Sequence, residues 1–350
     1  MLGRDGGGPA RFEPAAASFV SPSRGWVLGR YGCADCAAVR LTVDGGRHWR
    51  PLPSPEKPLW YYSPAPAMSG VSEKGVSDLV FADRRNGYLF GPQLLVTHDG
   101  GRSWARQPLS QVRVLEVGGG HAYALTETMG GQVRLWRAPI GRGGWTKLAV
   151  PRTTDATIAV EGATVLLLQT GFYGPGPSRA QLGRLWVSSD RGTHWQLRPL
   201  PCTARDGGAA LVAIVPARSA SWLLDCYANE QSSQAQNTQH HLYRTVDAGN
   251  SWARLSDPTR HNAPALLADN GAGHAFLATE GGAGDVLYGT LDGGRHWHPL
   301  LHSGGSFFGW ADLRFINRMT GFVVGPTHYA PEHLYRTLDS GRTWHVVPVG

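Results

Sequence analysis

The chain has 350 residues, of which 47 are glycine and 24 are proline, and only 17% are charged. This composition excludes a mainly helical fold, because glycine and proline both weaken helix interiors. The 41% of apolar residues excludes a disordered chain and is enough for a large core. The formal net charge is +7, but only Lys57, Lys74 and Lys147 are lysines, and the arginines are scattered singly without a basic run. The charge therefore indicates no nucleic-acid partner.

The N-terminal segment, residues 1–11, lacks the apolar stretch of a signal peptide. No apolar run reaches the roughly 18 residues that a transmembrane helix needs, so we expect no membrane span. We expect a tail over residues 1–11 and a single domain over residues 12–350. Either the chain is cytosolic, or the sequence is a mature form whose leader has been removed.

An octapeptide with the pattern Ser/Thr-x-Asp-x-Gly-x-Ser/Thr/His-Trp occurs six times, and a seventh, degenerate copy lacks the aspartate. The closing tryptophans are spaced by 41 to 57 residues. A repeat at this interval is the signature of an array of similar units. The repeat therefore indicates seven units over the whole chain, rather than the two domains that the chain length alone would suggest. These units end near Trp49, Trp104, Trp145, Trp195, Trp252, Trp297 and Trp344.

Within each unit, short apolar runs alternate with turn residues. In the second unit the runs are 76–82, 88–90, 94–97 and a run from Trp104, and the seventh unit repeats this pattern. Four short antiparallel strands repeated seven times predict an all-β fold, a seven-bladed β-propeller. The first strand, near residues 16–20, is expected innermost and the last strand outermost, so the ring should close by packing of the first blade on the last.

The octapeptide is expected to form the turn between the third and fourth strands of a blade. Its aspartate can accept hydrogen bonds from backbone N–H groups of the turn, its glycine can take a positive φ, and its tryptophan can pack between blades. We therefore predict a structural role for Asp44, Asp99, Asp190, Asp247, Asp292 and Asp339. We expect no metal and no cofactor, because each octapeptide offers one carboxylate and a hard cation needs about six oxygens.

These octapeptides resemble the Asp-box, or BNR, repeat of sialidases and related propellers. The Gly-aromatic pair that precedes them, as in Gly25-Trp26, Gly87-Tyr88 and Gly321-Phe322, is similar to that of the photosystem II assembly factor type of propeller. The resemblance covers nearly the whole chain. It implies the architecture rather than the function, since the motif occurs on catalytic and non-catalytic propellers.

The four cysteines fall into two plausible pairs. Cys33 and Cys36 lie in the connection between the second and third strands of the first blade. Cys202 follows the octapeptide strand of the fourth blade, and Cys226 ends the second strand of the fifth. This arrangement favours two disulfides and an oxidising compartment over free buried thiols. We expect an extracytoplasmic or secreted protein, with a cytoplasmic location as the alternative.

The long insertions are expected on the rim opposite the octapeptides, where the second-to-third strand loops and the blade connections lie. Aromatic residues on such loops can stack on sugars or grip an extended peptide, but they can also fold their own loops onto the propeller. The candidate ligand-binding residues are Trp60, Tyr61, Tyr62, Phe172, Tyr173, Arg179, Phe307, Phe308, Trp310, His328 and Tyr329.

Catalysis in the sialidase manner would require three arginines, a tyrosine with a glutamate partner, and an aspartic acid. The resemblance also implies an Arg-Ile-Pro-like segment before the first octapeptide, and neither Arg11-Phe-Glu-Pro nor Arg24-Gly-Trp matches it. We therefore expect a monomeric, non-catalytic binding or scaffold protein that grips a protein segment or a glycan. The alternative is a glycoside hydrolase of the sialidase type, such as an exo-sialidase.

Overall fold

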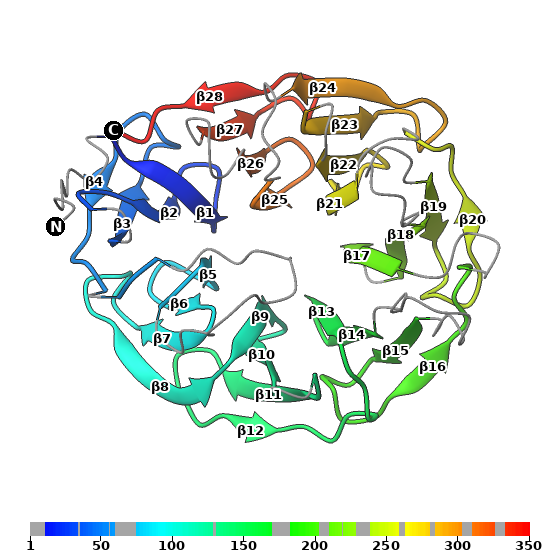
Figure 1. Cartoon of the computed structure of the whole chain (residues 1–350), viewed down its shortest axis with the longest axis horizontal. Coiled ribbons are helices and arrows are strands. Elements are labelled where there is room, and N and C mark those ends of the chain that lie inside the picture. Colours follow the sequence, from blue (N-terminus) through cyan, green and yellow to red (C-terminus); the bar gives the residue numbers. More distant parts are fainter. Residues whose placement is uncertain are drawn as a thin grey trace, which may run out of the picture.

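The computed structural model describes residues 11–33, 36–55, 57–59, 75–128, 131–169, 183–202, 210–218, 220–228, 239–258, 263–280, 284–302, 310–325 and 333–350. In these residues, 28 strands form seven antiparallel sheets of four strands each. The sheets follow one another around a ring (Figure 1). The chain is therefore a seven-bladed β-propeller, and the predicted fold class is confirmed.

The first four blades each use four consecutive strands, and every strand pairs with the next along the chain. Blade 1 comprises β1 (Glu13–Phe19), β2 (Gly25–Arg30), β3 (Ala37–Thr42) and β4 (Arg50–Pro51). Blade 2 comprises β5 (Asp78–Phe81), β6 (Gly87–Phe90), β7 (Gln93–Thr97) and β8 (Ala105–Ser110). Blade 3 comprises β9 (Val112–Gly118), β10 (His121–Glu127), β11 (Val133–Pro139) and β12 (Thr146–Lys147). Blade 4 comprises β13 (Ala156–Glu161), β14 (Thr164–Gln169), β15 (Arg184–Ser188) and β16 (Gln196–Arg198).

The last three blades follow the same order. Blade 5 comprises β17 (Ala210–Arg218), β18 (Ser221–Ala228), β19 (Gln239–Thr245) and β20 (Ala253–Arg254). Blade 6 comprises β21 (Ala263–Asp269), β22 (Ala275–Glu280), β23 (Val286–Thr290) and β24 (His298–His302). Blade 7 comprises β25 (Asp312–Phe315), β26 (Gly321–Gly325), β27 (His333–Thr337) and β28 (His345–Val347).

The first strand of each blade lies nearest the axis of the ring and the fourth lies outermost (Figure 1). Because successive strands are antiparallel, the connections between first and second strands and those between third and fourth strands share one rim, here called the box rim. The second-to-third strand loops and the blade connections share the other, here called the loop rim. The octapeptides therefore lie on the box rim.

The octapeptide turns contain the hydrogen bonds that their sequence predicts. In the turn after β7, Asp99 Oδ1 accepts from the backbone N–H groups of Arg102 at 2.9 Å and Ser103 at 3.0 Å. Its Oδ2 accepts from Ser103 Oγ at 2.6 Å, and Thr97 Oγ1 donates to its Oδ1 at 2.8 Å. The other five aspartates accept equivalent backbone hydrogen bonds. These carboxylates hold their own turns together, as an Asx-turn does.

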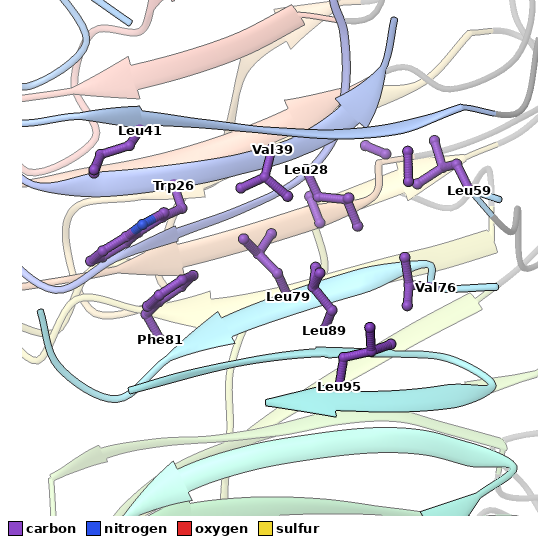
Figure 2. Packing of buried hydrophobic residues seen from close by; sticks show 13 residues of the cluster. Trp26, Leu28, Val39, Leu41, Leu59, Val76, Leu79, Phe81, Leu89 and Leu95 are labelled. Atoms are coloured by element: carbon purple, nitrogen blue, oxygen red, sulfur yellow. The ribbon is translucent and has the colours of Figure 1, made fainter. Parts of the chain in front are cut away.

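Aromatic side chains fill the seams between blades. At the seam of blades 1 and 2, Trp26 is fully buried and stacks on Phe81 with ring centroids 3.7 Å apart, as Figure 2 shows. Its indole N–H also donates to the carbonyl oxygen of Gly100, in the octapeptide turn of blade 2, at 2.9 Å. At the next seam, Trp145, which ends the degenerate octapeptide of blade 3, meets Tyr88 of blade 2 edge-on at 6.3 Å. The octapeptide tryptophan thus packs between blades, as predicted.

The ring closes through side chains between the first and last blades. Phe19 stacks on Phe322 with centroids 3.5 Å apart, and Arg40 Nη1 donates to the carbonyl oxygen of Val349 at 2.7 Å. All seven sheets are built from consecutive strands, so among the described residues no strand is exchanged between the two ends. The predicted closure by packing of blade 1 on blade 7 is confirmed.

Two disulfides are present, with the pairing that the sequence favours. Cys33 pairs with Cys36 in the connection between β2 and β3. Cys202 pairs with Cys226 and joins the segment after β16 of blade 4 to β18 of blade 5. The second pair is buried and therefore ties two neighbouring blades together from within the core. Two disulfides indicate an oxidising environment.

Candidate functional site

Four charged side chains from three inner strands meet at the centre of the ring, and we call them the channel cluster: Asp78 of β5, Glu116 of β9, and Asp312 and Arg314 of β25. Arg314 Nε donates to Asp312 Oδ1 at 3.1 Å, and Arg314 Nη1 lies 3.6 Å from Glu116 Oε2. Asp312 and Arg314 are two residues apart on one strand, so their side chains share a face. The cluster thereby connects blade 7 with blade 3 across the axis.

Negative charge exceeds positive charge in the channel cluster, because three carboxylates surround one guanidinium. Burial and the neighbouring carboxylate of Asp312 raise the pKa of Asp78 to about 7, although Arg314 opposes this rise. Burial also raises the pKa of Glu116, again against the effect of Arg314. The carboxylate of Glu116 in turn raises the pKa of Arg314, which stays charged. Near neutral pH the site can therefore take up or release a proton at Asp78.

A pocket of about 270 Å³ adjoins this cluster between the inner strands of blades 1, 2, 3 and 7. Asp312 and Arg314 line it, together with the rings of Phe19, Phe81 and Phe315. Asp78 and Asp312 are the first residues of their strands, which places them toward the loop rim. A group that passes the channel cluster into this pocket would meet first its carboxylates and then phenyl rings, a combination that suits a cationic side chain or the apolar face of a sugar.

We expect the Asp78→Asn variant to unfold at a higher temperature than the wild type at pH 8. The folded-state pKa of Asp78 lies near 7, above its usual value of 3.8, so its contribution to stability is present below about pH 4 and is lost as the pH rises toward 7. Asparagine carries no charge and escapes this loss. Thermal melts from pH 4 to pH 8 test this, and an equal difference between the two proteins at every pH would contradict it.

Most of the aromatic loop residues predicted as ligand contacts lie outside the described residues: Trp60, Tyr61, Tyr62, Phe172, Tyr173, Arg179, Phe307, Phe308, His328 and Tyr329. Trp310 is described and lies in the core, with 5% of its surface exposed. Its ring meets Tyr335 edge-on at 6.2 Å and covers the backbone of Gly325. The structure thus places Trp310 beneath the loop rim as a packing residue.

Sequence reasoning did not single out the channel cluster. One signal was present, since Asp78 and Asp312 stand at the same position in their units, each followed by leucine at the start of an inner strand. Acidic residues at the start of an apolar strand that borders a ring axis are candidates for a channel-lining role. Glu116 and Arg314 carry no such signal, because their approach depends on how far apart blades 3 and 7 lie.

In the described ranges, no group of three or more histidine, cysteine, aspartate or glutamate side chains is arranged to hold a metal ion. Within the same ranges there is no helix that could serve as a membrane span.

No protein-family model and no curated protein sequence matches this chain. Solved structures do match its fold. A structure of YCF48 bound to a D1 peptide is 19% identical, has a TM-score of 0.60, and is aligned over 94% of each chain. YCF48 from Cyanidioschyzon merolae is 13% identical, with a TM-score of 0.52 over 80% of this chain and 87% of that one. A GH74 xyloglucanase from Xanthomonas campestris is 16% identical, with a TM-score of 0.54 over 95% of this chain and 60% of the enzyme. At these identities the likeness is one of fold.

Proposed function

We propose that this chain is an Asp-box propeller that binds a protein segment at its loop rim, above the channel cluster. The observation that carries the proposal is the channel cluster, in which three carboxylates surround one guanidinium beside a pocket lined by phenyl rings. Ligands of ring-shaped folds gather where loops converge on such a concave, mixed surface. YCF48, which has a similar fold, is known in complex with a D1 peptide, and this supports a peptide over a small molecule.

The chemistry of the channel cluster favours a segment that carries a lysine or an arginine. A cationic side chain entering from the loop rim would offset the surplus charge of Asp78, Glu116 and Asp312. Arg314 already pairs with two of these carboxylates, so it would share them with the incoming group. The proposal therefore predicts discrimination by charge.

Peptide binding tests this directly. We expect an array of basic, neutral and acidic peptides to give binding confined to the basic ones. Calorimetry on a positive peptide should then show affinity at least about tenfold weaker for Glu116→Gln, because a charge-assisted contact contributes roughly 1.5–3 kcal/mol. Asp257→Asn is the matched control, since Asp257 pairs with Arg254 on an exposed outer strand. Equal binding by both variants, or binding to a glycan array with no peptide bound, would contradict the proposal.

A second candidate function, glycoside hydrolysis, is favoured by one observation. Asp78 has a pKa of about 7 and lies near two other carboxylates, and a glycosidase needs one protonated and one ionised carboxyl group. The similar fold of the GH74 xyloglucanase supports this alternative. We expect no turnover of a panel of chromogenic glycosides that includes a sialoside. Turnover that Asp78→Asn abolishes would make the chain a hydrolase and set the binding proposal aside.

The two disulfides support an extracytoplasmic or secreted location. Differential thiol labelling of the protein in its native cells tests this part of the proposal. With the protein denatured during labelling, because Cys202 and Cys226 are buried in the folded state, all four cysteines should resist alkylation before reduction and react after it. Free thiols at Cys202 and Cys226 before reduction would instead favour the cytoplasm.

A further inference from the structure

Four arginines from two blades come together on the box rim, at the seam between blades 1 and 2, and we call them the arginine seam. Arg24 lies in the β1–β2 turn and Arg50 in β4, both in blade 1. Arg84 lies in the β5–β6 turn and Arg102 in the octapeptide turn of blade 2. In the sequence they are separated by up to 78 residues and belong to no basic run. Their proximity is a product of the fold.

Backbone and side-chain contacts fix these turns against one another. The Trp26 indole N–H donates to the carbonyl oxygen of Gly100 at 2.9 Å, which joins the start of β2 to the octapeptide turn of blade 2. The N–H of Gly100 donates in turn to the carbonyl oxygen of Arg85 at 2.9 Å. A Cβ atom on Gly101 would lie 2.9 Å from Leu52, so the segment following Arg50 packs against the same turn. The bases of all four arginines are therefore held in place.

The positive charges of the arginine seam are not matched by acidic partners. In the part of the chain that the structure describes, none of the four guanidinium groups forms an ion pair with a carboxylate. The aspartates of the turns that carry Arg84 and Arg102, Asp83 and Asp99, accept hydrogen bonds from those turns. The guanidinium of Arg24 lies 5.6 Å from the ring centre of Trp26, and its buried Nε has no hydrogen-bond partner. Burial and the charges of Arg84, Arg50 and Arg102 lower the pKa of Arg24.

Other seams show how arginines at this rim are ordinarily used. In five of the six octapeptides, the carbonyl group of the residue after the aspartate lies within hydrogen-bond distance of a side chain of the preceding blade. Arg336 donates to this carbonyl in Gly45 at 2.5 Å, Arg137 to that of Arg191 at 2.8 Å, and Arg198 to that of Ala248 at 3.2 Å. At the seam of blades 1 and 2, Trp26 donates to the equivalent carbonyl of Gly100. The arginines there are thus not needed to join the blades.

We infer that the arginine seam binds a carboxylate-rich segment of a partner protein. The planar fork of arginine matches a carboxylate with two parallel hydrogen bonds, and four forks in one place suit several acidic side chains in succession. A single-stranded nucleic acid would require aromatic platforms for its bases. The exposed large apolar side chains in the described turns of the box rim are not aromatic: Val43, Val246, Leu291, Met319 and Leu338. Exposed Tyr31 lies on the β2–β3 loop of the loop rim. The inference goes beyond the proposed function, because it concerns the opposite rim and the opposite charge.

Fluorescence anisotropy with a short labelled peptide of alternating glutamate and serine tests the inference, and the same peptide with glutamine in place of glutamate is its control. We expect the double variant Arg24→Gln/Arg84→Gln to bind the acidic peptide at least about tenfold more weakly, and added salt to weaken wild-type binding. Arg342→Gln is the control variant, which removes an arginine from the box rim outside the arginine seam. Arg342 holds the position of Arg102 in the octapeptide of blade 7, and both donate to the carbonyl oxygen of their own aspartate. This variant should bind like the wild type.

The inference is overturned if the acidic peptide does not bind, or if Arg342→Gln weakens binding as much as the double variant does. Tighter binding of a single-stranded oligonucleotide than of the acidic peptide would point to a nucleic-acid site instead. Because Arg24 packs on Trp26, the single variant Arg84→Gln and thermal melts of every variant separate loss of binding from loss of folding. Glu116→Gln tests the channel separately and should leave binding of the acidic peptide unchanged, so each proposal can fail without the other.

Discussion

Replacement of Trp26 with alanine should lower the free energy of unfolding by about 3–5 kcal/mol. The indole is fully buried between blades 1 and 2, stacks on Phe81 at 3.7 Å, and donates a hydrogen bond to Gly100 (Figure 2). Truncation to alanine removes the buried ring, leaves a cavity in the seam, and leaves the carbonyl group of Gly100 without this donor. Urea unfolding followed by tryptophan fluorescence and by circular dichroism measures the loss.

Trp26→Phe separates the two contributions, because phenylalanine keeps an aromatic ring against Phe81 and removes the indole N–H. We expect the free energy of unfolding of this variant to lie between those of Trp26→Ala and the wild type. The lost hydrogen bond should account for roughly 1 kcal/mol of the decrease. Val43→Ala, at an exposed position of the first octapeptide, should change stability by less than about 0.5 kcal/mol. A loss below about 1 kcal/mol in Trp26→Ala would mean that the seam does not depend on this residue.

Removal of the Cys202–Cys226 disulfide with a double alanine variant should cost about 3–4 kcal/mol. The bond closes a loop between cysteines 24 residues apart, and the chain entropy that such a loop removes from the unfolded state corresponds to that range. Both cysteines are buried, so alanine also leaves a small cavity between blades 4 and 5. Denaturant midpoints of the variant and the oxidised wild type measure the difference.

The other disulfide supplies the matched control. Cys33 and Cys36 are three residues apart on a loop, so removal of their bond should cost only about 2 kcal/mol by the same reasoning. Equal losses of stability from the two double variants would show that loop entropy does not govern how much each disulfide stabilises the fold. A larger loss from the short loop would reverse the expectation and indicate that the β2–β3 connection supports the fold more than the buried bond does.

Both sites depend on the seams between blades. The channel cluster draws its members from blades 2, 3 and 7, and the arginine seam draws its members from blades 1 and 2. A variant that loosens the seam at Trp26 should therefore weaken binding of an acidic peptide even though every arginine remains. Replacement of Trp222 in blade 5 is the comparison, because this tryptophan is equally buried, has the same side chain and is distant from both groups.

Several features of this protein follow from the sequence alone, because they depend on contacts between residues close together in the chain. The octapeptide fixes its own turn through Asp99, Thr97 and Ser103, which lie within seven residues. Its recurrence therefore predicted seven blades and the all-β class. The pairing of Cys33 with Cys36 could be predicted because both lie on one loop. That of Cys202 with Cys226 could be predicted because their two blades are neighbours in the chain.

Only the tertiary structure decided where charges meet. Asp78, Glu116 and Arg314 are far apart in the sequence, and their approach depends on the width of the ring and on the side of each strand that faces the axis. The arginines looked scattered because each belongs to a separate turn, and the stacking of blade 2 on blade 1 gathers four of them. A repeat fixes the shape of each unit through local hydrogen bonds, whereas electrostatic contacts between units depend on distances through space that no periodicity in the sequence encodes.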